Sequence, residues 1–185
     1  MSTFTTLDDL LDALAAGERE DDAEDVDALA HHLQCAALLA ERAPDDVELQ
    51  VAGLVHDVAS TVWPGRPATH ASAGAALVES LLGSRVAWLV GHHDQAKRYL
   101  VTTEPDYRDR LSVSSVHTLE AQGGLLDARE RAELEASPDL DAVLTLRRAD
   151  DDAKVPGRRV PGLEHWSTVL ASLHRNYCRA ATPKP

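Results

Sequence analysis

The sequence predicts an all-α fold of about ten helices, and three observations support this prediction. Hydrophobic residues make up 44% of the 185 residues but aromatic residues only 4%. Alanine and leucine therefore carry the apolar content, which favours packed helices over sheets. Apolar residues recur at helical spacing along most of the chain, and no segment alternates as a half-buried strand does. The length suffices for one domain with a substantial core.

Helix start and stop signals divide the first half of the chain into five segments. Leu7, Leu10 and Leu14 share one helical face, and glycine or proline ends most segments. The expected helices are Thr6 to Gly17; Val26 to Ala43; Asp45 or Asp46, as cap, to His56 and Asp57; His70 to about Leu82, capped by Thr69; and one capped by Ser84 that reaches His92 and His93 and extends toward Leu100.

The second half continues the pattern after a break at Glu104-Pro105-Asp106. Asp127 and Glu130 have the spacing of a capping box. The expected helices are Ser112 to Gly123 and Gly124; Asp127 to Pro138; Leu140 to Asp150; and about Leu163 to Ala180. We expect a single domain over 1–185, with an N-terminal helix and acidic loop (1–25), a metal-binding core (26–155) and a C-terminal helix (163–180).

Composition excludes several classes of partner. The formal charge of −13 argues against nucleic acid, because phosphates are repelled by such a surface. No stretch has the length of a membrane span and the N-terminus lacks a secretory signal, so a cytoplasmic protein is expected. Cys35 and Cys178 are isolated, which fits a reducing compartment. Nothing in the sequence indicates an oligomeric state.

A histidine and an aspartate, His56 and Asp57, stand together inside an apolar run. An unpaired carboxylate there is costly, so it requires a cation. Helices packed around one core can aim further ligands at the same point. The candidates are His31 in the middle of its helix, His56 at a helix C-terminus, His70 at a helix start, His93 near a helix C-terminus, Asp57 and Asp150. This set suits iron, manganese or zinc, and it fits two ions if Asp57 bridges them.

The order of these residues resembles the HD-domain metalloproteins, whose pattern is H…HD…D with two added histidines in binuclear members. A closer resemblance, to the HD-domain oxygenases of phosphonate catabolism, covers most of the chain. It is carried by His31-x-x-Gln34-Cys35-Ala36, His93-x-x-x-Lys97-Arg98-Tyr99-Leu100, Leu111-Ser112-x-x-Ser115, Thr118-Leu119-Glu120-x-Gln122-Gly123-Gly124 and Leu146-Arg147-Arg148-x-Asp150-Asp151-x-Ala153-Lys154.

This resemblance implies a mixed-valent Fe(II)/Fe(III) centre that uses O₂ to break a carbon–phosphorus bond. The expected substrate is a 1-hydroxyalkylphosphonate with a 2-amino or 2-trimethylamino group, and the expected products are phosphate and a carboxylic acid. One iron would be held by His31, His56, Asp57 and Asp150, the other by Asp57, His70 and His93. Matching positions for substrate contact are Lys97, Ser115, Thr118, Gln122, Arg147 and, toward an amine, Glu24.

Residue chemistry agrees with an anion site, since a phosphonate dianion favours a guanidinium, an ammonium and neutral donors together. Ser115, Thr118 and Gln122 are spaced three and four apart, so one helical face presents all three. Lys97 lies four residues after His93, on the face of that ligand.

The sequence departs from the family pattern at three positions. Ser60 replaces a histidine of the H-D-x-G-H motif, Asp21 stands where a loop tyrosine is usual, and Ala149 replaces a tryptophan. Spacing selects His31 over His32 and His93 over His92. Two other functions stay open: a metal-dependent HD phosphohydrolase acting on a nucleotide or phosphate ester, and a non-catalytic HD module that binds a ligand.

Overall fold

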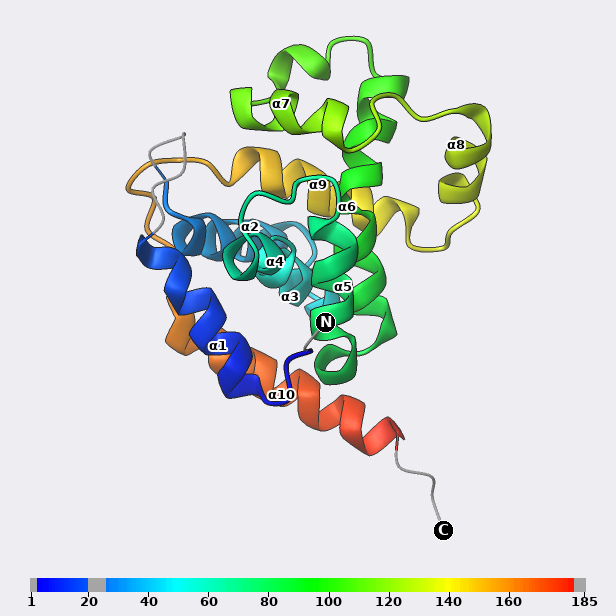
Figure 1. The fold of residues 1–185 in the computed structure, drawn as a ribbon. Helices are drawn as coiled ribbons and strands as arrows, with labels where there is room; N and C mark the ends of the chain where they lie inside the picture. Colours follow the sequence, from blue (N-terminus) through cyan, green and yellow to red (C-terminus); the bar gives the residue numbers. More distant parts are fainter. Residues whose placement is uncertain (1–2, 20–25, 182–185) are drawn as a thin grey trace.

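The chain is helical in the computed structural model, which describes residues 3–19 and 26–181 (Figure 1). That part holds ten α-helices, two short 3₁₀ helices and no strand, so the all-α prediction is confirmed. The α-helices are α1 (Leu7–Ala16), α2 (Ala28–Arg42), α3 (Val47–Val55), α4 (Val58–Val62), α5 (His70–Leu82), α6 (Ser84–Thr103), α7 (Val113–Ala121), α8 (Ala128–Glu135), α9 (Leu140–Asp152) and α10 (Leu163–Ala181).

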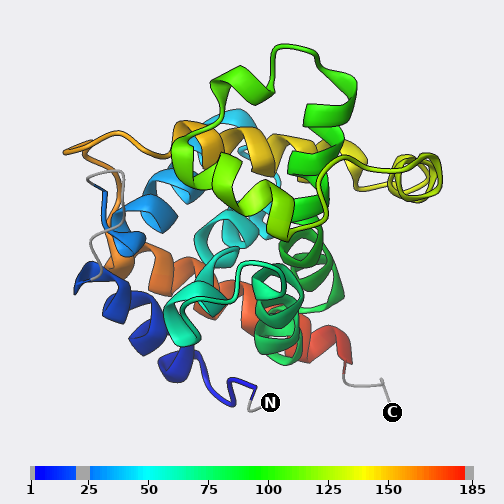
Figure 2. The same ribbon diagram turned by 45° about the horizontal axis from the view of Figure 1, so that its top comes forward.

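Five helices form the centre of the bundle. The pair α5 and α6 pack along each other, α3 packs on α2 and α6, and α9 lies against α6 and α2. Helices α1 and α10 lie side by side along one flank, whereas α8 projects from the opposite side (Figures 1 and 2). In the described residues no helix has the length and apolarity to cross a bilayer.

Helix α3 is the most buried of these elements. Residues 49–55 are all buried, and Leu54 and Val55 have no exposed surface. The flanking helices complete the core: α1 inserts Leu10 and Leu14, and α10 inserts Trp166 and Leu170. Because α3 is surrounded, His56 at its C-terminal end is fully buried, and the next residue, Asp57, is partly buried with 30% of its side chain exposed.

Two expected helix positions are wrong in a way that matters for the site. Asp27 caps α2, its Oδ1 accepting from the Ala30 N–H at 2.7 Å, so the helix begins at Ala28. His31 therefore lies at the first turn and not in the middle. Helix α6 continues to Thr103, which places His93 in its middle and Lys97 one full turn later.

The caps agree with the sequence at some helices and differ at others. Asp127 forms the expected capping box, Thr6 forms one that was not predicted, and Asp46 and Ser112 cap α3 and α7. Thr69 makes no capping hydrogen bond. Ser84 is the first residue of α6 and not its cap; that position belongs to Gly83, whose φ of 91° favours glycine. The short helix α4, after His56 and Asp57, was not predicted.

Arg98 of α6 fixes the loop that follows α7. Its guanidinium donates to the carbonyls of Gly123, Gly124 and Leu125 at 3.0–3.4 Å and to Glu130 at 2.8 Å, and 8% of Arg98 is exposed. Gly123 has a φ of 105°, and a Cβ there would lie 3.2 Å from the guanidinium. Gly123 thus lets the backbone approach Arg98 closely.

We expect Arg98→Ala to lower the free energy of unfolding by about 1.5–3 kcal/mol, the usual contribution of hydrogen bonds to a buried charge. Urea denaturation measures this change. Arg129→Ala is the matched control, because the Arg129–Glu133 pair is exposed on α8 and should leave the midpoint unchanged. Equal midpoints for the two variants would contradict this role of Arg98.

Candidate functional site

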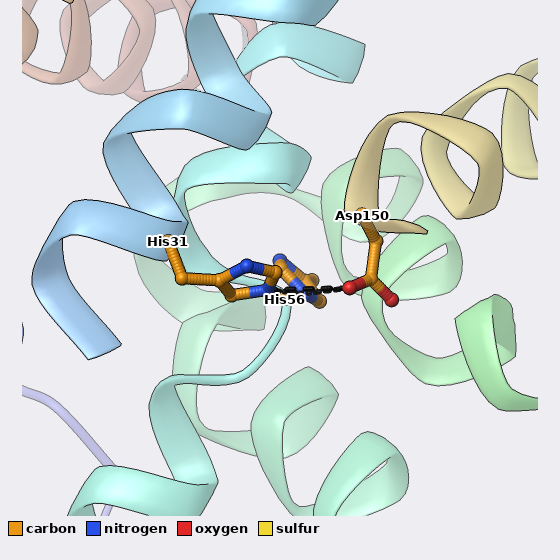
Figure 3. Close-up of side chains that lie close together, drawn as sticks. All are labelled: His31, His56 and Asp150. Carbon is orange, nitrogen blue, oxygen red and sulfur yellow. Dashed lines mark hydrogen bonds and ion pairs between the residues drawn. The ribbon is translucent and has the colours of Figure 1, made fainter. Parts of the chain in front are cut away.

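Two groups of potential metal ligands lie in the centre of the bundle, and together they contain all six predicted ligands. The first group comprises His31 from α2, His56 from the turn after α3, and Asp150 from α9 (Figure 3). The Nε2 atoms of the two imidazoles are 3.3 Å apart, and Asp150 Oδ1 lies 3.2 Å from His31 and 3.7 Å from His56. All three residues are buried.

The second group joins α4, α5 and α6. The Nε2 atoms of His70 and His93 are 3.0 Å apart, and Asp57 Oδ1 lies 3.2 and 3.4 Å from them. The other carboxylate oxygen, Asp57 Oδ2, lies 3.5 Å from His56 Nε2 in the first group. Asp57 therefore stands between the two groups with one oxygen toward each, as a bridging ligand requires.

The imidazole tautomers show that a cation fits here. In each of the four histidines Nδ1 faces a backbone carbonyl, which can only accept, so Nδ1 carries the proton and a neutral ring has its lone pair on Nε2. The pairs are His31 with Ala153 O (3.0 Å), His56 with Gly53 O (2.9 Å), His70 with Pro67 O (2.7 Å) and His93 with Val90 O (2.7 Å).

Lone pairs of neighbouring Nε2 atoms then face each other at 3.0–3.3 Å, and Asp57 Oδ1 is buried among them without a hydrogen bond of good geometry. Such an arrangement is repulsive unless a positive charge lies between the atoms. A metal ion in each group supplies that charge, so the donor set fits two ions.

Without a metal ion, burial and the neighbouring charged groups set the pKa values of the aspartates and of His70. Burial raises the pKa of Asp57, but the His56 charge and contacts with His70 and His93 hold that pKa well below its usual range. Burial lowers the pKa of His70, and Asp57 more than offsets it, raising the pKa to about 9. Burial also opposes ionisation of Asp150, whereas Arg147 keeps its pKa well below normal. Both carboxylates are thus available as anionic ligands.

A pocket of about 280 Å³ opens onto both groups, and its opposite wall is rich in donors. The five predicted substrate residues of the core all line it: Lys97, Ser115, Thr118, Gln122 and Arg147. Lys97 Nζ donates to Thr118 Oγ1 at 2.8 Å and to the Ser115 carbonyl at 3.3 Å. Burial and the neighbouring Arg147 charge lower the pKa of Lys97 to about 8.

Arg147 connects this wall with the first ligand group. Its guanidinium donates to Asp150 Oδ2 at 2.6 Å, to Ser115 Oγ at 3.2 Å and to the hydroxyl of Tyr107 at 3.3 Å, and it also pairs with Asp151. Only 3% of Arg147 is exposed. The buried guanidinium therefore both orients the candidate metal ligand Asp150 and lines the pocket.

Sequence reasoning missed several pocket residues. Lys154 adds a third cation, with Nζ 3.0 Å from Ser112 Oγ, although it belongs to a quoted motif. Asp94 and Thr61 also line the pocket. So does His32, over which spacing had selected His31 as the ligand: burial and the charges of His56 and His31 lower the pKa of His32 to about 3. The Nδ1 atom of His32 has no hydrogen-bond partner among the described residues.

The three departures from the family pattern have different outcomes. Ser60 lines the pocket, so the hydroxyl replaces the imidazole at its wall. Ala149 is fully buried and is not among the pocket-lining residues. Asp21 and Glu24 lie outside the described residues.

Comparisons with known proteins agree with this geometry. The HD domain model matches residues 29–153. The chain is 33% identical over 153 residues to the 1-hydroxy-2-(trimethylamino)ethylphosphonate dioxygenase (glycine-betaine-forming) of Leisingera caerulea, covering 78% of each chain. It is 35% identical over 158 residues to the hydroxymethylphosphonate dioxygenase of Gimesia maris, covering 80% of this chain and 78% of that one. An uncharacterized protein of Acanthamoeba polyphaga mimivirus is 28% identical over 149 residues, or 75% and 68% of the two chains. The chain therefore belongs to the HD-domain family.

Proposed function

We propose that this protein is a diiron oxygenase that cleaves the carbon–phosphorus bond of a 1-hydroxyalkylphosphonate. The observation that carries the proposal is the single pocket shared by two histidine–aspartate groups and a cationic wall. The names of both dioxygenase relatives support it, because each describes a phosphonate with a hydroxyl on the carbon next to phosphorus.

His31, His56 and Asp150 would hold one iron, His70 and His93 the other, and Asp57 would bridge them. A mixed-valent iron pair, when bound, supplies the redox chemistry with O₂. The reaction balances as one 1-hydroxyalkylphosphonate and one O₂ giving one carboxylic acid and one phosphate. The C–H and C–P bonds at C1 are oxidised, and O₂ accepts the four electrons.

The protein's own contribution is placement of the anion. Lys97, Lys154 and Arg147 supply positive charge at one end of the pocket, and Ser115 and Thr118 supply neutral groups between them. Although the chain carries a formal net charge of −13, these cations make the local charge positive where the substrate binds. With the phosphonate fixed there, its C1 is directed toward the two ligand groups.

The pocket must also accept the rest of the substrate. Three buried polar atoms that line the pocket have no hydrogen-bond partner among the described residues: His32 Nδ1, Thr61 Oγ1 and Gln122 Oε1. Buried polar groups are rarely left unpaired, so these atoms are suited to bonds with substrate or with water that accompanies it. An amine contact from Glu24 stays a prediction.

The test is anaerobic loading with Fe(II), followed by O₂ and either hydroxymethylphosphonate or 1-hydroxy-2-(trimethylamino)ethylphosphonate. An oxygenase consumes one O₂ for each phosphate released. A phosphohydrolase, the alternative that the same ligand set permits, would release phosphate from esters without O₂. A binding module would do neither, and either of these last two results would overturn the proposal.

Lys97 should give the reaction a distinctive pH dependence. Its pKa of about 8 means that the ammonium is charged below pH 8 and loses its charge as pH rises. We expect kcat/KM for the phosphonate to fall above about pH 8, mainly through a higher KM. In Lys97→Arg the falling limb should move to higher pH, because a guanidinium does not titrate in this range. An unmoved limb would assign the titration to another group.

A further inference from the structure

Two side chains of α2 hold the segment that follows α9. His31 donates through Nδ1 to the carbonyl of Ala153 at 3.0 Å. One helical turn later, the Gln34 amide donates through Nε2 to the Val155 carbonyl at 3.0 Å and accepts through Oε1 from the Val155 N–H at 3.1 Å. Lys154 lies between the two residues held in this way, so its backbone is fixed on both sides.

The Lys154 side chain extends from this segment to the pocket. It lines the pocket, and its Nζ donates to Ser112 Oγ at 3.0 Å and to Ser115 Oγ at 3.4 Å. A lysine has a long flexible stem, so holding its ammonium in one place costs rotamer entropy, and a mobile backbone would add to that cost. A backbone that is already fixed at residues 153–155 therefore favours anion binding by this ammonium.

Completing the hydrogen bonds after α9 does not by itself require a buried glutamine. Val155 is 46% exposed, and its carbonyl also accepts from the Arg158 N–H at 3.2 Å, so solvent reaches this residue. Gln34 is only 1% exposed and precedes the core residues Cys35 and Ala36, where burial of an amide is costly unless both of its ends are bonded. Fixing the position of the segment explains this glutamine better than satisfying a helix end.

We propose that Gln34 is a positioning residue that places the Lys154 ammonium where it contacts the phosphonate. The inference rests on the anion pocket of the proposed function. The paired hydrogen bonds from Gln34 to Val155, together with the bond from His31 to Ala153, set the distance between α2 and the segment that carries Lys154. Gln34 itself is not among the pocket-lining residues, so it acts on the substrate through Lys154.

The test is a double-mutant cycle of Gln34→Met and Lys154→Met, measured by calorimetric titration of the iron-loaded protein with methylphosphonate in the absence of O₂. Methionine is similar to glutamine in length but makes neither hydrogen bond to Val155. Each single variant should bind methylphosphonate about tenfold more weakly than the wild type, because a hydrogen bond from a charged donor is lost or misplaced. In the Lys154→Met background, Gln34→Met should have no further effect.

Gln50→Met is the matched control. Gln50 is also buried, and its amide donates to the carbonyls of Ala43 and Pro44 at 2.9 and 3.0 Å, but it does not line the pocket. This variant should bind methylphosphonate as the wild type does. Gln34→Glu keeps the acceptor for the Val155 N–H, so its affinity should lie between those of the wild type and Gln34→Met, and it provides the test if the methionine variant does not fold.

Two results would overturn the positioning role and leave the proposed function standing. One is wild-type affinity in Gln34→Met, and the other is an equal loss of affinity on Gln34→Met with and without Lys154, which would indicate a general structural effect. Wild-type protein that binds no methylphosphonate would overturn the anion pocket of the proposed function, and the inference with it.

Discussion

Replacing Asp57 by alanine is expected to lower the iron content from two ions and to reduce turnover of a hydroxyphosphonate by more than ~100-fold. Asp57 is unique among the described candidate ligands in having one oxygen beside each group. Its loss therefore weakens both positions together. Removing an outer partner of a metal ligand alone costs about 10–100-fold, and removal of a bridging ligand should exceed that.

Elemental analysis after iron loading, combined with O₂ uptake, measures this effect. The variant should still fold, because Asp57 is surrounded by imidazoles and makes no good hydrogen bond through Oδ1, so its removal leaves no donor unpaired. Asp57→Asn is the companion variant, as it retains the shape and one neutral oxygen. If Asp57→Ala retained two irons and turnover within tenfold of wild type, Asp57 would not be the bridge.

Replacing Arg147 by methionine should lower the free energy of unfolding of the metal-free protein by about 3–5 kcal/mol. Burial alone would lower the pKa of Arg147, but Asp150 and Asp151 raise it well above its usual value, so the guanidinium stays charged. Methionine leaves the buried Asp150 and the nearby Asp151 without their cation. Breaking a buried pair by removing one partner has a cost of this size.

Urea denaturation of the metal-free protein measures the change, and addition of metal should recover part of it, because an ion also neutralises Asp150. Arg148→Ala is the matched control at the next position: its guanidinium is 41% exposed and pairs with Glu104, so its loss should cost less than about 1 kcal/mol. Arg147→Lys retains a charge but not the planar guanidinium, so its free energy of unfolding should lie between those of the wild type and Arg147→Met. Equal stabilities of the methionine and control variants would refute the buried-pair role.

The sequence predicted best those features that depend on residues close together in the chain. The capping residues Thr6, Asp127 and Ser112 act within one helical turn, and their effect is visible in the spacing alone. The pair His56 and Asp57 stood out because histidine and aspartate in an apolar run are costly without a cation. The order and spacing of the resembled family then selected the other candidate ligands, which are His31, His70, His93 and Asp150. The expected all-α bundle followed from apolar periodicity.

Where sequence reasoning failed, the cause was packing or geometry between helices. Asp94 gave no signal, because a carboxylate after His93 on a long helix is usually solvent-exposed. The structure places it beside His70 of α5, since α5 and α6 pack along each other. Likewise, the hydrogen bonds from Arg98 to the carbonyls of residues 123–125 depend on how the loop folds back onto α6, which residue spacing does not give.

The sequence by itself determined that this protein is an all-helical chain carrying four histidines and two aspartates suited to metal, because periodicity and the cost of buried polar groups are properties of the residues. The family resemblance implied the two ligand groups with Asp57 between them, but only the tertiary structure gave the distances within and between the groups and placed Lys154 with Lys97 and Arg147 on one pocket. Those facts depend on distances between helices, which arise when the helices pack around α3.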